Sequence, residues 1–503
     1  MHEEFNVSTW LVDRHVDDGR GNTIAIRSGG ASHTYADVLD ASRRVATGLR
    51  GAGVQPEQRV AMVMLDSPEF VATFLGALRI GAIPVLTNPI LPGRDLGVII
   101  ADARARIVVI SADRAGSIDA ICARAPEVVA VVTTGGDEWA DFTASDDDGD
   151  PYATWDDSPG FWLCTSGTTG QPKLAMHTHG DVRATVENYA IGVLEMSAED
   201  RCFSVGPMFH AYGLGNSLTF PFAVGASTVL EPTRPPTPQL VADLCAAERP
   251  TLFFCIPTFY AALTNSDLSD EAFSSVRFGV SAAEALPPET FHRFLERFGV
   301  TILDGIGSTE LLHIFLSNLP DRHRPGTSGV AVPGYDARVV DLDGSDAAPG
   351  EPGALLVRGA SAASGYWCRA EQTRATFEGA WVRTGDLYER SDDGFFTYLG
   401  RADDMMRVGG EWVSPAEVEA TLIEHPEVLE AAVVGVRDER DILRPVAHVI
   451  PVDSGTTAAD ALAESLTAWC RERLAGYKRP KQYVVVDELP KTATGKIQRY
   501  KLR

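Results

Sequence analysis

The chain has 503 residues, of which 45% are hydrophobic and 22% are charged, a composition typical of folded globular proteins and not of disordered ones. This length exceeds the size at which one hydrophobic core stops growing, so we expect at least two domains. The net charge of −25 excludes a general nucleic-acid-binding surface, because binding to a phosphate backbone requires positive charge.

Neither secretion nor a membrane is indicated by the sequence. No apolar run approaches the roughly 20 residues that span a bilayer, and the start Met-His-Glu-Glu lacks the basic and apolar regions of a signal peptide. The cysteines number seven, with no C-x-x-C pair, which favours reduced thiols over disulfides or a zinc site. We therefore expect a cytoplasmic protein, monomeric or homodimeric, that has neither nucleic acid nor a membrane as a partner.

In the first 400 residues, apolar helical patterns alternate with short β-rich runs. The helical patterns lie at 43–54 and 69–82, and the strand-like runs at 59–65, 83–88, 105–112 and 127–134. Such alternation predicts an α/β domain in which helices flank mixed sheets. An acidic segment punctuated by Gly and Pro, 143–160, is expected to be a surface connection.

A loop rich in glycine and hydroxyl groups follows this connection and reads TSGTTGQPK, residues 165–173. Gly167 and Gly170 allow backbone N–H groups to turn toward an anion, and Lys173 adds a positive charge. Further donors are the hydroxyl groups of Thr165, Ser166, Thr168 and Thr169. The spacing differs from that of P-loop NTPases, so the loop alone is equally compatible with a phosphate site and with a polar turn.

The pattern changes after residue 400. A helix is predicted from Ser414 as N-cap, with Pro415 at its first position and Glu417 at the capping-box position, until Pro426 ends it. Strand-like runs at 430–436, 445–452 and 482–489 and an amphipathic helix at 459–476 complete a small α+β domain. We therefore expect a large domain at 1–400 and a small one at 401–503. The small domain carries 15 Lys and Arg against 17 Asp and Glu, so nearly all of the net negative charge lies in the large domain.

Five motifs in chain order resemble those of the acyl-adenylating superfamily, which includes acyl-CoA synthetases, adenylation domains and luciferases. They are TSGTTGQPK (165–173), DGIGSTE (304–310), WVRTGDL (381–387), YLGRADDMMRVGGEWVSPAEVE (398–419) and LPKTATGKIQRYKLR (489–503). The resemblance covers essentially the whole chain. Three further stretches, at 209–227, 305–318 and 324–335, look most like benzoate-CoA ligases and other aryl-CoA ligases.

The resemblance implies a ligase reaction in two halves. ATP and a benzoate-like acid would form aroyl-AMP and pyrophosphate, and the thiol of coenzyme A would then displace AMP. Mg²⁺, lysine and backbone donors would offset the crowded negative charge. A second function with the same chemistry delivers the acyl group to the phosphopantetheine of a carrier protein. The superfamily also contains luciferase-type oxygenases and could contain non-catalytic nucleotide-binding proteins, but no feature of this sequence favours either of these two functions.

The same resemblance assigns the phosphate chemistry. Residues 165–173 would cover the β- and γ-phosphates, Glu310 would hold Mg²⁺, and Thr309 would hydrogen-bond the α-phosphate. Lys496 would bridge the carboxylate of the acid and the α-phosphate. Without the other motifs, Glu310 would be interpreted as a charge at a helix start and Lys496 as a solvated tail residue.

For the nucleoside, the resemblance implies that Asp304 accepts from the adenine amino group and that Asp386 accepts from both ribose hydroxyls, with Arg401 nearby. The other expected nucleotide contacts are Ala283, Glu284, Gly305 and Ile306. Two of these positions depart from the family pattern, because Ala283 replaces a glycine and Ile306 replaces an adenine-stacking aromatic. Leu174 also replaces the glycine that usually follows Lys173. From the two lost glycines we expect a slightly displaced backbone near the adenine.

The hinge between the two domains would be Asp403, which would let the small domain present Lys496 for adenylation and then swing it away. In the second state Gly409 and Gly410 would line the pantetheine tunnel, where the absence of side chains permits close approach. Lys478 would meet the phosphates of CoA, although a solvated basic turn explains this lysine equally well.

The acyl site follows from the likeness to aryl-CoA ligases. One wall would contain Ala211 and Tyr212, with His210 as an aromatic gate. The other wall would contain Gly305, Gly307, His313 and Ile314. Small residues beside flat ones suit an aromatic ring held mainly by shape. His313 is equally compatible with a buried core histidine.

Overall fold

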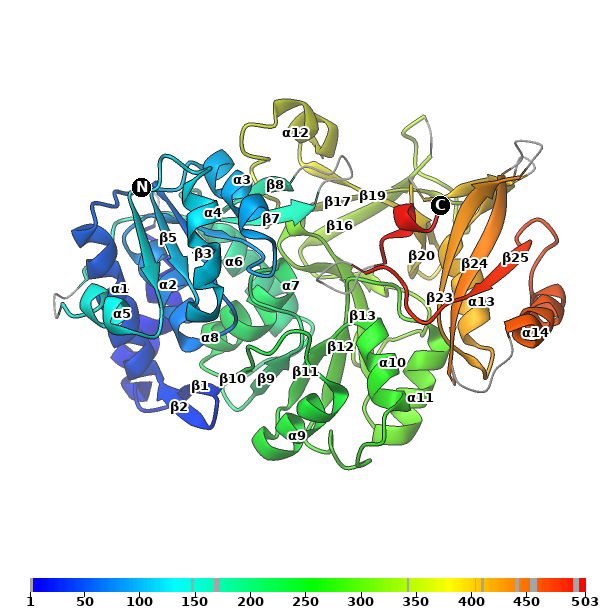
Figure 1. The fold of residues 1–503 in the computed structure, drawn as a ribbon, viewed down its shortest axis with the longest axis horizontal. Helices are drawn as coiled ribbons and strands as arrows, with labels where there is room; N and C mark the ends of the chain where they lie inside the picture. Colours follow the sequence, from blue (N-terminus) through cyan, green and yellow to red (C-terminus); the bar gives the residue numbers. More distant parts are fainter. Residues whose placement is uncertain are drawn as a thin grey trace.

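The computed structural model describes residues 3–145, 149–166, 172–341, 343–402, 404–408, 411–438, 443–452, 459–491 and 497–503. Figure 1 shows the elements that begin the chain at one end of the molecule and those that follow residue 404 at the other. Two large sheets and a smaller one form the first part, and a compact α+β unit forms the second. The α/β fold class with a large and a small domain is therefore confirmed.

The first sheet has six strands with helices on both faces. In spatial order the strands are β6 (Ala130–Thr133), β5 (Ile107–Ile110), β3 (Arg59–Val63), β4 (Ile83–Leu86), β7 (Pro159–Ser166) and β8 (Pro172–Thr178). The helices are α1 (Tyr35–Gly51), α2 (Pro68–Arg79), α3 (Gly93–Ala103), α4 (Ile118–Cys122), α5 (Asp137–Phe142) and α6 (His179–Thr185). Only the pair β7–β8 is antiparallel. The central strands are continuous apolar runs because α1 and α2 cover one face and α3 and α4 the other.

The second sheet has nine strands. In spatial order they are β15 (Val330–Ala331), β14 (Ile314–Ser317), β13 (Ile302–Gly307), β12 (Phe278–Ser281), β11 (Leu252–Cys255), β9 (Arg201–Ser204), β10 (Ser227–Leu230), β1 (Ile24–Ser28) and β2 (Ala31–Thr34). Its helices are α7 (Ala211–Leu214), α8 (Phe220–Val224), α9 (Pro238–Glu248), α10 (Pro257–Asn265) and α11 (Pro288–Phe298). In this spatial order, the neighbouring strands from β13 to β1 are parallel. Helices α9, α10 and α11 bury one face of this part of the sheet.

An antiparallel third sheet completes the large part of the molecule. Its strands are β16 (Tyr335–Val340), β17 (Gly353–Gly359), β19 (Trp381–Arg390), β18 (Phe377–Glu378) and β20 (Phe396–Arg401), with α12 (Ala370–Thr376) in the connection. One buried cluster joins the three sheets, since it contains Met62 of β3, Phe254 of β11 and Val357 of β17. The ends of strands from different sheets are thereby held close together.

The C-terminal unit has a core of its own. Its elements are β21 (Met406–Val408), β22 (Glu411–Val413), α13 (Pro415–Ile423), β23 (Val428–Arg437), β24 (Leu443–Pro451), α14 (Ala459–Arg473) and β25 (Gln482–Val485). A separate apolar cluster includes Val418 of α13, Val433 of β23 and Leu466 of α14. The last residues return across this unit between β20 and β23 (Figure 1), where Arg499 forms an ion pair with Glu419 at 2.8 Å.

The elements predicted from apolar runs correspond to real ones, with ends shifted by a few residues. Ser414 caps α13 by accepting from the N–H of Glu417 at 3.1 Å, as predicted. The Glu417 carboxylate, however, pairs with Lys478 at 2.6 Å. Within the described ranges, no helix combines the length and the apolar character needed to cross a membrane.

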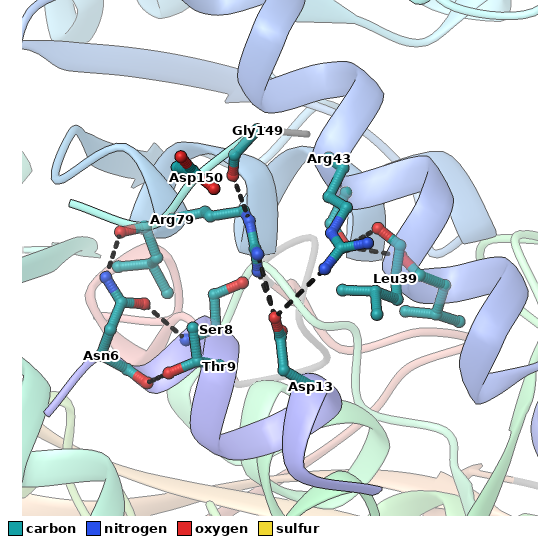
Figure 2. Close-up of polar contacts among 12 residues, drawn as sticks. Asn6, Ser8, Thr9, Asp13, Leu39, Arg43, Arg79, Gly149 and Asp150 are labelled. Atoms are coloured by element: carbon teal, nitrogen blue, oxygen red, sulfur yellow. Dashed lines mark hydrogen bonds and ion pairs between the residues drawn. The ribbon is translucent and has the colours of Figure 1, made fainter. Parts of the chain in front are cut away.

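Arg79, the last residue of α2, ties the N-terminal segment to the first sheet (Figure 2). Its side chain is only 2% exposed and donates to both carboxylate oxygens of Asp13 at 2.9 Å and to the carbonyl of Gly149 at 2.5 Å. Nearby, Asn6 donates to the carbonyl of Leu78 at 3.0 Å. A buried guanidinium is tolerated here because a carboxylate and a carbonyl accept its hydrogen bonds.

Replacing Arg79 by alanine should therefore lower the free energy of unfolding by about 3–5 kcal/mol, because it leaves the Asp13 carboxylate without its buried partner. Urea unfolding of the variant measures this loss. The double variant Arg79→Met with Asp13→Leu is the control, and it should be much closer to the wild type, since it removes both charges together. A double variant as unstable as Arg79→Ala would contradict this account.

Candidate active site

The predicted nucleotide residues converge where the sheets meet. Asp304 lies in β13, and the chain leaves that strand into a 3-10 turn, Thr309–Leu311. His177, at the end of β8, contacts the Thr309 carbonyl at 2.8 Å. The turn therefore lies beside β8, the strand that follows the predicted phosphate loop, and at the carboxyl end of a parallel strand, where α/β proteins commonly bind ligands.

Glu310 is held by a tyrosine that no sequence motif singled out. The hydroxyl of Tyr366 donates to Glu310 Oε1 at 2.6 Å, and Lys173 Nζ lies 4.7 Å from the centre of the Tyr366 ring. Burial and then the Glu310 charge raise the pKa of Tyr366, so the hydroxyl stays protonated as a donor. A cation, an aromatic ring and a carboxylate thus lie side by side, with the cation at the start of β8.

The predicted ribose residues face each other across two strands. Asp386 of β19 is the register partner of Arg401 of β20, and Arg401 donates to its carboxylate at 3.0 Å. Burial lowers the pKa of Arg401, but Asp386 outweighs this effect and, with a smaller effect of Glu310, raises it above the ordinary value. The Asp386 side chain is only 8% exposed, and the ion pair with Arg401 offsets the cost of its burial.

Asp304 has the features of a ligand acceptor. The residue is 7% exposed, and within the described part of the chain no donor reaches its Oδ1. Burial raises its pKa well above the usual range. Since a buried acceptor without a donor is costly, a bound amino group such as that of adenine would stabilise this carboxyl.

Two other predicted nucleotide residues have structural roles. Ala283 has φ of 78°, a left-handed conformation that costs an alanine about 1–2 kcal/mol and a glycine almost nothing. The backbone thus keeps here a conformation that favours glycine, although the side chain is a methyl group. Glu284 accepts from the hydroxyl of Thr258 near the start of α10 at 2.6 Å.

The residues predicted for the acid also lie together. Tyr212, in α7, donates to the carbonyl of Val280 at 3.0 Å, and its ring lies 5.6 Å from that of His313. A methyl group on Gly305 would come within 2.9 Å of the side chain of Ile314, and one on Gly307 within 2.5 Å of the His313 carbonyl. The close approach of β14 therefore requires both glycines. The adjoining predicted residues are Ala211 at the start of α7, His210 just before it, and Ile306 in β13.

His313 is a neutral buried histidine in this structure. It is 2% exposed, with its Nε2 3.1 Å from Asn216 Oδ1 and the Phe220 ring at 4.4 Å. Burial lowers its pKa from 6.5 to about 3. The ring therefore remains uncharged in the folded protein near neutral pH.

This shift predicts a difference in acid stability. The unfolded chain binds a proton at His313 below pH 6.5 and the folded chain does not. The stability gained by keeping the neutral ring buried is therefore complete above pH 6.5 and is lost as the pH falls. Between about pH 7.5 and pH 5, the free energy of unfolding of the wild type should therefore fall further than that of His313→Gln, by about 2 kcal/mol. Urea titrations at both pH values measure this difference, with exposed His323→Gln as the control. Identical pH dependence in His313→Gln and the wild type would contradict the prediction.

Several predicted residues fall outside the described part of the chain. These are Gly167, Thr168, Thr169, Gly170, Asp403, Gly409, Gly410 and Lys496, together with the side chain of Ser166. Of the others, Thr165 lies opposite Lys173 in the β7–β8 pair, and Lys478 forms its ion pair with Glu417. No group of three or more His, Cys, Asp or Glu side chains suited to a metal ion occurs among the described residues.

Known proteins resemble this chain in both sequence and structure. The family described as AMP-binding enzyme matches residues 12–367, and its C-terminal domain matches residues 417–496. A benzoate–CoA ligase of Thauera aromatica is 42% identical over 508 residues, which cover 100% of this chain and 96% of the relative.

Two solved structures are similar over almost their whole length. One is an anthranilate CoA ligase in complex with anthranoyl-AMP, with a TM-score of 0.95 and 38% identity, covering 99% of this chain and 97% of that one. The other is a benzoate CoA ligase from Burkholderia xenovorans LB400, with a TM-score of 0.92 and 39% identity, covering 99% and 100%.

Proposed function

Because the chain belongs to the AMP-binding enzyme family, we propose that it is an ATP-dependent ligase that joins a benzoate-like aromatic acid to coenzyme A. The observation that carries the proposal is the convergence of a buried acceptor oxygen, Asp304 Oδ1, with a Tyr366-bound Glu310 beside β8. Similarity over the full length to two benzoate–CoA ligases supports the choice of acid.

The chemistry begins with a carboxylate, which is a poor electrophile because its leaving group would be oxide. One carboxylate oxygen attacks the α-phosphorus of ATP, and the bond to pyrophosphate breaks. The thiol sulfur then attacks the acyl carbon, loses its proton, and AMP leaves with the former carboxylate oxygen. Lys496 would stabilise the first step, and Lys173 the departing pyrophosphate, by offsetting negative charge.

The residues present also suit Mg²⁺, which would neutralise phosphate charge when it is bound. Mg²⁺ commonly uses one or two protein carboxylates together with substrate phosphates and water. Glu310 would supply the carboxylate, held by Tyr366. A protein cage of several acidic residues is not required for this kind of site.

The nucleoside would be held by residues of two sheets. Asp304 would accept from the adenine amino group, beside Ala283, Glu284, Gly305 and Ile306. Asp386 would accept from the ribose hydroxyls while Arg401 pairs with its carboxylate. In this assignment ATP crosses from β13 to β19, and its triphosphate runs toward β8.

The small domain would alternate between the two half-reactions. We place its boundary after residue 400 and its pivot at Asp403, between β20 and β21. Lys478, Gly409 and Gly410 would serve the thiol step. We also place the protein in the cytoplasm, for which seven cysteines free of disulfides give support.

Pyrophosphate exchange with a panel of acids tests the function. Substituted benzoates should support faster exchange than cinnamates or short fatty acids, because small residues at 211 and 305 beside Tyr212 and Ile314 suit a flat aromatic ring. Exchange with fatty acids alone, or with no acid, would contradict the proposal.

The acceptor is tested separately. Thioester formation should be rapid with free CoA and slow with a phosphopantetheinylated carrier protein. The reverse result would indicate that the enzyme loads a carrier protein. Consumption of oxygen after adenylation would indicate a luciferase-type oxygenase.

A further inference from the structure

The turn that carries Thr309 and Glu310 is fixed by donors from other elements. The Glu310 carbonyl accepts from the N–H of Ala363 at 2.8 Å, and the Leu311 carbonyl accepts from the hydroxyl of Ser361 at 2.8 Å. Leu312, which follows, has φ of 65°, a strained value for a leucine. The neighbouring contacts therefore determine the shape of this turn.

The third carbonyl of the turn, that of Thr309, is reached from the first sheet by a side chain. His177 Nε2 lies 2.8 Å from it, across 132 residues of sequence. His177 is four residues beyond Lys173 in β8, so this bond directly joins the strand after the phosphate loop to the turn that presents Glu310.

The imidazole of His177 is itself held in place. Its side chain is fully buried, and Nδ1 lies 2.7 Å from Asp181 Oδ2. The Asp181 carboxylate also accepts from the N–H and hydroxyl of Thr178, and the Phe161 ring stacks on the imidazole with centroids 5.4 Å apart. Because a carbonyl can only accept, the ring donates to Thr309 from Nε2.

We propose that His177 is a positioning residue for the first half-reaction. Its Nε2–H fixes the Thr309 carbonyl, and through it the turn that aims Thr309 and Glu310 at the nucleotide phosphates. Asp181 orients the ring for this bond. The inference rests on the proposed function, since it presumes that Glu310 faces Mg²⁺ and the triphosphate.

Two replacements separate the contacts of the ring. The amide nitrogen of glutamine can occupy the place of Nε2 and donate to Thr309, whereas that of asparagine imitates Nδ1 and stops short of Thr309. His179→Asn is the matched control, because His179 is equally buried two residues away and its Nδ1 accepts from the N–H of Val7 at 3.1 Å. All variants are studied as full chains, with thermal unfolding recorded.

The readout is calorimetric binding of a non-cleavable ATP analogue, α,β-methylene-ATP, with and without Mg²⁺. His177→Asn should weaken Mg²⁺-dependent binding by about 10–100-fold, as loss of a group that orients a metal ligand commonly does. Binding without Mg²⁺ should weaken much less, because only the contact of Thr309 with the phosphates is then affected. His177→Gln should recover most of the loss, and His179→Asn should bind like the wild type even if it unfolds at a lower temperature.

Equal binding by His177→Asn and the wild type would overturn the proposal, as would an equal loss in His179→Asn. If His177→Asn does not fold, His177→Gln decides: affinity near that of the wild type supports the Thr309 contact, and a loss of about tenfold or more contradicts it. Failure of the proposed function is distinguishable, because it would be seen in the wild type as absent benzoate-dependent pyrophosphate release while analogue binding persists.

Discussion

Lys496→Ala should slow aroyl-AMP formation by about 10²–10³-fold, the usual cost of removing one donor that stabilises developing charge. In our proposal its ammonium group bridges the carboxylate of the acid and the α-phosphate only during adenylation. Thioester formation from supplied aroyl-AMP should therefore change much less. Pyrophosphate release and thioester formation, measured separately on the same preparation, check both parts.

The matched control is Lys491→Ala, five residues earlier. Lys491 forms an ion pair with Glu430 at 2.8 Å, so its replacement should affect the stability of the small domain more than either half-reaction. Equal losses in both half-reactions for Lys496→Ala would contradict the assigned role. They would indicate that the whole enzyme is impaired, and not that a charge needed only for adenylation is missing.

Glu310→Gln should lower the rate of adenylation by about 10²–10³-fold, because an amide does not supply the negative charge that Mg²⁺ binding requires. Tyr366→Phe should cost about tenfold, since it removes only the 2.6 Å hydrogen bond that orients Glu310. The phenylalanine ring still lies beside Lys173. Initial rates of pyrophosphate release over a range of Mg²⁺ concentrations measure both effects.

The Mg²⁺ dependence separates the two variants. Excess Mg²⁺ should partly restore Tyr366→Phe, whose carboxylate is present but less well oriented. It should not restore Glu310→Gln. Full activity of Glu310→Gln at any Mg²⁺ concentration would remove Glu310 from the proposed metal site.

Local features of the fold followed from local patterns. Ser414 and Pro415 predicted the start of α13, because capping depends on residues three positions apart. Apolar runs predicted β3, β4, β5 and β6. The fate of the Glu417 carboxylate did not follow, because its partner, Lys478, is 61 residues away and local spacing contains no information about such a contact.

Motifs predicted the candidate ligand-binding residues, but not the side chains that hold those residues in place. Asp304 and Glu310 stand in recognisable strings, and the structure brings both to the end of β13. Tyr366 and His177 stand in no such string, and they reach this turn only because three sheets share one core. The slightly displaced backbone expected near the adenine stays a prediction, and the structure gives Ala283 a φ of 78° despite its methyl group.

The central claim is that an oxygen of an aromatic carboxylate attacks the α-phosphorus of ATP. Benzoate labelled with ¹⁸O in both carboxylate oxygens tests it most directly, by mass spectrometry of the nucleotide released after transfer to CoA. We predict AMP that contains a single ¹⁸O atom from each turnover. Unlabelled AMP, or label found in inorganic phosphate together with ADP, would contradict adenylation of the acid and the account built on it.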